Sequence, residues 1–147
     1  MFGSRSRVTH FLDTNVVLRH LLNDDPAQSQ AARHLFERIE TGDIVVWTSE
    51  LVIAEVVFVL SNKRTYNLPP GRISELLLPL IDLPNLKLAG KRLHARAFSL
   101  YISLNVDYID AYHIALMESR GSRDMFSFDH DFDMVPGLNR HEPELPG

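Results

Sequence analysis

Apolar residues along this chain occur in two arrangements, short continuous runs and longer stretches with helical spacing. The short runs are rich in β-branched and aromatic residues, which favours buried strands. They lie at residues 7–12, 43–47, 85–89 and 125–128. The longer stretches repeat apolar residues every three or four positions, which predicts amphipathic helices. They cover residues 15–22, 25–40, 49–63, 72–83, 91–104 and 107–120.

Capping residues and turn residues set several of these bounds. Asp25 is followed by Pro26 and Gln28, the residue types expected at the N-cap, first and third positions of a helix. We expect that helix to stop near Gly42 and Ser49 to cap the next one. The predicted loops are the Pro-Pro-Gly of residues 69–71 and an acidic stretch at 129–137.

Strands that alternate with helices predict an α/β fold, with a mostly parallel central sheet and helices on both faces. The chain has 147 residues, of which 45% are hydrophobic and 23% are charged. That length is enough for one sizeable core, so we expect a single domain over residues 8–147. Residues 1–7 are expected to form a flexible N-terminal arm.

Composition excludes several classes of protein. Cysteine is absent, which excludes disulfides, thiol catalysis and cysteine metal sites. No apolar stretch approaches the roughly 18 to 20 residues that span a bilayer, so we expect a cytoplasmic protein with no membrane partner. The net charge of −4 argues against a broad basic surface for nucleic acid. A site that binds nucleic acid through cations can nevertheless be acidic in its own residues.

Acidic residues follow the predicted strands and interrupt the predicted helices. Asp13 ends the first strand, and Asp129 and Asp131 come directly after the last one. Ligands of parallel sheets bind beyond the carboxyl ends of the strands, so these acids are placed to reach one edge. Glu55 lies in an apolar run, where a buried charge would need a cation, a hydrogen-bond network or a raised pKa. Asp107 and Asp110 share one helical turn.

Each acid also has a purely structural interpretation. Asp13 and Asp107 could be helix N-caps, and for Asp107 this is the favoured interpretation. Asp131 could belong to a solvated loop, and Glu55 could face outward on its helix. Taken singly, the structural interpretation is favoured for every acid except Glu55, but it weakens when the acids are considered together.

The four motifs FLDTNVVL, SELVIAEVVFVL, DYIDAYHIAL and MFSFDHDF occur in this order. This order resembles the PIN-domain ribonucleases, most closely the VapC-type toxins of toxin–antitoxin pairs. The resemblance runs from about Val8 to the end of the chain. It implies a quartet of acids made of Asp13, Glu55, Asp110 and Asp129, with Asn15 and Ser127 as polar companions. Ser127 stands where many family members have threonine, a change that keeps the hydroxyl.

The resemblance also implies an activity. Four converging carboxylates repel one another, by roughly 4 kcal/mol for two charges about 4 Å apart at an effective dielectric of 20. Hard oxygen ligands favour Mg²⁺ or Mn²⁺, which can activate water at a scissile phosphate. We therefore expect Asp13, Glu55, Asp110 and Asp129 to act as metal ligands or to orient water. Asn15, Ser127 and further candidates Asp107 and Asp131 would support the ligands or contact phosphate.

The implied substrate is single-stranded RNA, cut to leave 5′-phosphate and 3′-hydroxyl ends. The implied partners are a cognate antitoxin, whose segment occludes the acidic site, and a second copy of the chain in a homodimer.

Two other functions remain open on the residues. An aspartyl-phosphate phosphatase would use Asp13, but such enzymes need a second Asp two residues later, where this chain has Asn15. A non-catalytic binding module would use the apolar helices to hold a partner. The spacing of His113 and His130 does not match a zinc motif, and no glycine-rich nucleotide loop is present.

Overall fold

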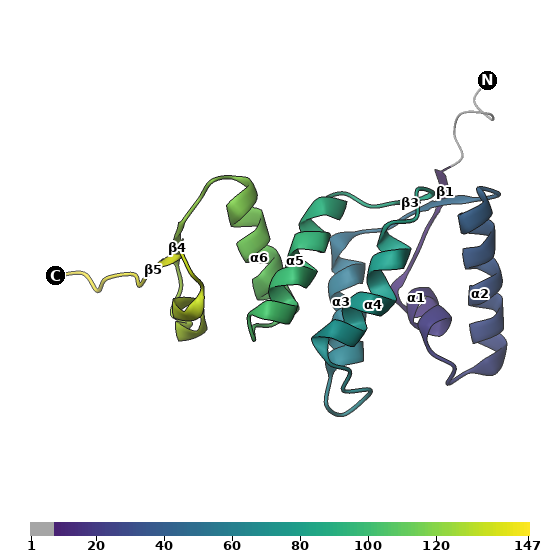
Figure 1. Ribbon diagram of the computed structural model, residues 1–147, viewed down its shortest axis with the longest axis horizontal. Coiled ribbons are helices and arrows are strands. Elements are labelled where there is room, and N and C mark those ends of the chain that lie inside the picture. The colour runs from purple at the N-terminus through teal and green to yellow at the C-terminus, as the bar shows by residue number, and fades with distance from the viewer. Residues whose placement is uncertain (1–7) are drawn as a thin grey trace, which may run out of the picture. The chain divides into compact units, whose positions relative to one another are not determined.

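Three short parallel strands in the order β1–β2–β3 form a sheet in the first part of the chain, and β1 and β3 of this sheet are labelled in Figure 1. The structure is a computed structural model that describes residues 8–147, so the predicted N-terminal arm lies outside the described residues. The strands are β1 (Val8–Phe11), β2 (Val45–Trp47) and β3 (Leu86–Lys87). The central residue Val46 is buried and pairs with His10 on one side and Leu86 on the other. The predicted parallel α/β sheet is confirmed.

Four helices connect these strands. They are α1 (Thr14–Leu21), α2 (Pro26–Thr41), α3 (Glu50–Ser61) and α4 (Pro70–Ile81). Asp25 caps α2 by accepting a hydrogen bond from the Gln28 backbone, and the helix ends at Gly42, as predicted. Gly42 has a φ of 84°, a left-handed conformation that glycine adopts without steric cost. Ser49 caps α3, also as predicted.

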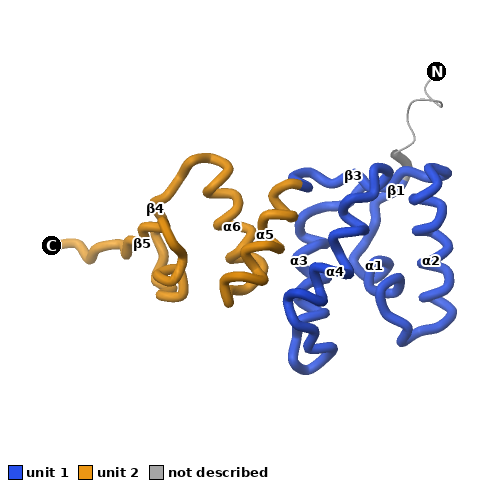
Figure 2. The backbone as a smooth tube through the Cα atoms, in the orientation of Figure 1, with its two compact units in different colours: residues 1–91 blue, residues 92–147 orange. Residues whose placement is uncertain are grey.

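The described residues divide into two compact units, one ending at Lys91 and the other running from Arg92 to Gly147 (Figure 2). The second unit contains α5 (Lys91–Ser103, apart from its first residue) and α6 (Tyr108–Ser119). After them come β4 (Asp124–Phe126), the short 3₁₀ helix η1 (His130–Met134) and β5 (Asn139–His141). β4 and β5 pair in parallel.

Each unit has its own buried residues. In the first unit the largest fully buried side chains come from α2, α3, α4 and β2: Ile39, Val46, Val56, Val57, Leu60, Ile73, Leu77 and Ile81. In the second unit α5 packs on α6 through buried aromatic residues, which are Phe98, Tyr101 and Tyr108. Within residues 8–147, no helix is long and apolar enough to cross a membrane.

Three local predictions are wrong. The Pro-Pro-Gly segment is not all loop, because Pro70 begins α4 at a position where a missing N–H costs nothing. The acidic stretch after β4 contains η1, whose first turn is capped by Asp129. β5 was not predicted, because its sequence Asn-Arg-His is short and polar, and its pairing rests on backbone groups.

Candidate active site

Asp13 is held where β1 passes into α1. Leu12 extends the pairing of β1, since its N–H donates to the Trp47 carbonyl at 2.8 Å. The buried Thr48 hydroxyl donates to the Leu12 carbonyl, also at 2.8 Å, and fixes the chain just before Asp13. Asp13 then caps α1, because its Oδ1 accepts from the Thr14 N–H at 2.8 Å. The interpretation of Asp13 as a helix N-cap is therefore correct. The capping hydrogen bond uses only Oδ1 of the carboxylate.

Thr14 links Asp13 to Glu55 of α3. Its backbone N–H binds Asp13, and its hydroxyl donates to Glu55 Oε1 at 3.3 Å. The two acids are thus contacted by one residue, although they are 42 positions apart in the sequence.

The expectation that Glu55 is buried is wrong. Glu55 is exposed, and the exposed face of α3 also carries Leu51 and Phe58, one turn before and one turn after it. The opposite face packs into the core of the first unit. Because hydrophobic residues occupy both the buried and the exposed face of α3, the sequence pattern does not show which face is exposed to solvent.

Asn15 is exposed one residue beyond Thr14, on α1. It lies at a groove of about 380 Å³ between α1 and α2, which Arg19 and Gln28 also line. Arg19 is engaged there, because its Nε donates to Gln28 at 2.8 Å and its Nη1 to Asp24 at 3.2 Å.

Asp110 is half-buried in the first turn of α6. Burial raises the pKa of its carboxyl group, and the negative charges of Asp107, Asp129 and Asp131 raise this pKa further, against a smaller opposing effect of His113. Asp107 occupies the N-cap position that was predicted for it, but its side chain makes no capping hydrogen bond. Asp110 is therefore influenced by the negative charges of three other carboxylates of the second unit.

The first turn of α6 is anchored by an aromatic cluster against α5. His94 of α5 is fully buried, and its Nδ1 lies 2.7 Å from the Tyr108 hydroxyl. Burial lowers the pKa of His94 to about 4, so its ring is neutral at pH 7. Phe98 packs on the Tyr108 ring with centroids 4.6 Å apart. Tyr108 is thus fixed two residues before Asp110.

Asp129 begins η1, just beyond β4. Its Oδ1 accepts from the Asp131 N–H at 2.9 Å, and its own N–H donates to the Ser127 hydroxyl at 3.0 Å. Ser127 therefore orients the backbone at Asp129, a supporting role that fits its predicted place beside the acid. Asp129 and Asp131 are both exposed.

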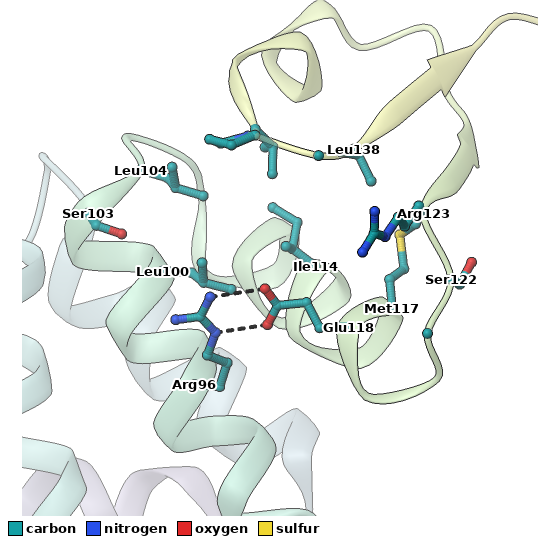
Figure 3. Close-up of a pocket in the computed structure, with 14 residues that line it drawn as sticks. Arg96, Leu100, Ser103, Leu104, Ile114, Met117, Glu118, Ser122, Arg123 and Leu138 are labelled. Atoms are coloured by element: carbon teal, nitrogen blue, oxygen red, sulfur yellow. Dashed lines mark hydrogen bonds and ion pairs between the residues drawn. The ribbon is translucent and has the colours of Figure 1, made fainter.

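A separate cavity of about 640 Å³ lies in the second unit between α5, α6 and the residues that flank β4 and β5 (Figure 3). Its walls are mainly apolar, and Arg96 and Glu118 face each other across one side through two hydrogen bonds of 2.8 and 2.9 Å. None of the four candidate acids lines it. This cavity is therefore not the acidic site.

The chemistry of the acidic residues suits a hard divalent cation. Asp13 and Glu55 offer carboxylate oxygens in the first unit, and Asp110 and Asp129 do so in the second. A cation near Asp110 would offset the repulsion that raises the pKa of this residue. Within the described residues of either unit, no three histidine or acidic side chains lie close enough to hold a metal ion by themselves. The convergence of all four acids stays a prediction.

The family model of the PIN domain matches residues 10–138 of the chain. This protein belongs to the PIN-domain family. The match includes all four candidate acids and both polar companions, and the predicted family is confirmed. Membership supports nuclease activity in general.

Among solved structures, this PIN domain is similar to VapC20 of Mycobacterium tuberculosis, a toxin that cleaves the sarcin–ricin loop. The two chains are 19% identical, the match covers 87% of this chain and 95% of VapC20, and the TM-score is 0.38. No curated protein matches the sequence.

Two residues with supporting contacts were missed by sequence reasoning. Thr14 was passed over, although it is the middle residue of Asp-Thr-Asn and touches both acids of the first unit. Arg140 was passed over because no motif surrounds it, yet it binds three residues of the Asp129 segment. The local sequence does not predict the contact of Thr14 with Glu55 or those of Arg140, because each depends on how another element of the fold is placed beside it.

Proposed function

We propose that this PIN domain is a metal-dependent endoribonuclease that cleaves single-stranded RNA. The observation that carries the proposal is the half-buried Asp110 carboxyl group, whose pKa is raised by burial and by neighbouring negative charges, in a chain that belongs to a nuclease family. Crowded carboxylates cost free energy unless a cation or a proton neutralises them. Binding of Mg²⁺ or Mn²⁺ near Asp110 would supply that neutralising charge.

Asp13, Glu55, Asp110 and Asp129 are the proposed ligands of the same cation or cations. A bound divalent cation would supply an activated water and would stabilise charge on the scissile phosphate. The chain's own residues would hold the geometry: Thr14 fixes Asp13 relative to Glu55, and Ser127 fixes the backbone of Asp129. Asn15, Asp107 and Asp131 are proposed to support the ligands or to contact RNA phosphates.

Metal dependence gives the first prediction. Purified protein incubated with a fluorogenic single-stranded RNA should cleave it with Mg²⁺ or Mn²⁺, and EDTA should reduce the rate to background. Excess Mg²⁺ added after EDTA should restore it. The products should carry 5′-phosphate and 3′-hydroxyl ends. Cleavage that persists at full rate in EDTA would contradict a metal-dependent mechanism.

We further propose that the protein is the toxin of a cytoplasmic toxin–antitoxin pair and forms a homodimer. The supporting observation is the open face of α3, where Leu51 is 72% and Phe58 is 66% exposed on either side of Glu55. An antitoxin segment placed on these side chains would bury apolar area and cover the acid at the same time. The same face would serve a non-catalytic binding module, and the RNA assay separates the two functions.

The partner proposal gives the second prediction. The protein alone should sediment as a dimer, and co-expression with an adjacent small gene product should give a tighter complex. Leu51→Ser combined with Phe58→Ser should weaken that complex at least about tenfold, because truncated central apolar anchors typically cost 2 kcal/mol or more. Ile102→Ser, which changes an exposed residue on α5, serves as the control. A stable monomer that no co-expressed protein binds would contradict the proposal.

A further inference from the structure

Arg140 of β5 is a largely buried arginine, and all of its hydrogen-bond donors are paired when Nδ1 of His130 is the unprotonated ring nitrogen. Its side chain is 10% exposed. A guanidinium has five N–H groups and accepts no hydrogen bonds. Here Nε donates to Asp133 Oδ1 at 2.7 Å, Nη1 donates to the Ser127 carbonyl at 2.8 Å and to Glu142 at 2.7 Å, and Nη2 reaches Asp133 Oδ2 at 3.4 Å and His130 Nδ1 at 3.0 Å.

Three of these four acceptor residues belong to the segment that carries Asp129. Ser127 lies two positions before it, His130 follows it directly, and Asp133 lies at the far end of η1. One planar group therefore joins the start, the middle and the end of a seven-residue segment, residues 127–133. Within this segment Arg140 contacts Ser127, His130 and Asp133 but not Asp129. Any effect of the arginine therefore reaches Asp129 through these neighbours.

The other side-chain contacts of the segment lie at its exposed surface: His130 is 3.2 Å from Asp133 and 3.5 Å from Glu142, and the Asp129 and Asp131 amides bind side chains within the segment. η1 has only five residues, and 3₁₀ geometry gives poor hydrogen bonds. Asp129, Asp131 and Asp133 repel one another within five positions, and all three side chains are exposed. Phe132 is its only buried residue among those described. A fixed positive group on the inner side of the segment offsets this repulsion, and contact with Arg140 lowers the pKa of Asp133.

Arg140 is itself held in place by strand pairing. β5 lies parallel to β4, with Arg140 opposite Met125. The Ser127 N–H donates to the His141 carbonyl at 2.9 Å, which extends this pairing to the first residue of the acidic segment. The guanidinium thus projects from a short strand that the same segment helps to form.

We propose that Arg140 is a positioning residue that sets the conformation of residues 127–133 and so presents the Asp129 carboxylate for metal binding. The part that concerns metal rests on the proposed nuclease function. The part that concerns conformation rests only on the contacts described above. Lysine cannot replace arginine here, because a single ammonium cannot reach all of the acceptors that surround the guanidinium fork.

The experiment compares Arg140→Lys with Arg96→Lys in the full chain. Arg96 is a matched control, because it lies in the same unit and makes a forked ion pair with Glu118, at 2.8 and 2.9 Å, but contacts no residue of the acidic segment.

The first readout is amide hydrogen exchange by NMR in metal-free protein. Exchange at the Asp129 and Asp131 amides, which bind Ser127 Oγ and Asp129 Oδ1, should become at least about tenfold faster in Arg140→Lys, a loss of about 1.4 kcal/mol of protection. The Arg96→Lys control should exchange at the wild-type rate there. Unchanged exchange in Arg140→Lys, or equal acceleration in Arg96→Lys, would overturn the proposal.

The second readout is RNA cleavage as a function of Mn²⁺ concentration. Arg140→Lys should need at least about tenfold more Mn²⁺ for half-maximal rate, and part of the lost rate should return at saturating Mn²⁺. A wild-type protein without nuclease activity would refute the proposed function and leave the exchange result to decide the role of Arg140. Faster exchange with an unchanged Mn²⁺ requirement would refute positioning for metal binding. If Arg140→Lys does not fold, Asp133→Asn should give smaller effects of the same sign.

Discussion

Asp110→Asn should reduce RNA cleavage by orders of magnitude and leave the metal-free protein at least as stable as the wild type at pH 7. Asparagine keeps the size of the side chain and one possible ligand oxygen, but it removes the charge. Loss of a single ligand at a site that binds cations through carboxylates lowers both occupancy and the precision of substrate placement. The fall in activity should therefore greatly exceed any change in stability.

The stability part of this prediction follows from the direction of the pKa shift. Burial first, and then the charges of Asp107 and Asp129, raise the pKa of Asp110 in the folded protein. The folded state therefore holds this proton at a higher pH than the unfolded state does. The free energy of unfolding falls as pH rises from the unfolded pKa through the raised folded pKa, and this penalty is fully present above both. At pH 7 the uncharged asparagine escapes the penalty.

Thermal scans with EDTA or Mg²⁺ at matched pH test both parts. Mg²⁺ should raise the melting temperature of the wild type, because it binds only the folded state, and should raise that of Asp110→Asn much less. Glu75→Gln, a change to an exposed acid on α4 that pairs with Arg72, is the control and should respond to Mg²⁺ like the wild type. A variant that is destabilised, still responds to metal and still cleaves RNA would refute the assignment of Asp110.

The sequence predicted best those features that depend on neighbours along the chain. The start of α2 at Asp25 and Pro26 and its end at Gly42 follow from local hydrogen bonding and backbone freedom, so the residues themselves carry the information. The order of strands and helices, and the family, followed from similar local patterns. Asp13 was correctly placed at the junction of β1 and α1, where it also caps the helix.

Features that depend on distant parts of the chain were harder to predict. Glu55 was expected to be buried because its neighbours are apolar, but α3 has Leu51 and Phe58 on its exposed face. The contact between Thr14 and Glu55 joins residues 41 positions apart. Arg140 gains its contacts only because β5 returns beside β4, and a three-residue polar strand has no apolar pattern to reveal it.

The second large effect should come from pH and His94. Its folded pKa of about 4 results from burial, whereas an ordinary histidine has a pKa near 6.5. Between these two pH values His94 is protonated in the unfolded state and neutral in the folded state. The free energy of unfolding should therefore decrease as pH is lowered from about 6.5 towards 4, and His94 should have no effect on the pH dependence above that range. The slope from one such group is at most about 1.4 kcal/mol per pH unit.

The raised pKa of Asp110 acts in the opposite direction at the acidic end of this pH range, so the contribution of His94 must be measured separately. A variant that keeps the hydrogen bond to Tyr108 but has no titratable group at position 94 does this. His94→Asn places an amide group near the position of Nδ1, where it can pair with the Tyr108 hydroxyl. It should be less stable than the wild type at pH 7, because it leaves a cavity beside Tyr108 and Tyr112. However, its unfolding free energy should fall less steeply between pH 6.5 and 4.

Denaturant unfolding at several pH values measures both slopes, with the exposed His34→Gln as the control, which should keep the wild-type slope. If protonation of the His94 ring opposes folding, its removal must reduce the dependence of the unfolding free energy on pH. Equal slopes in the wild type and His94→Asn would therefore refute this role of His94.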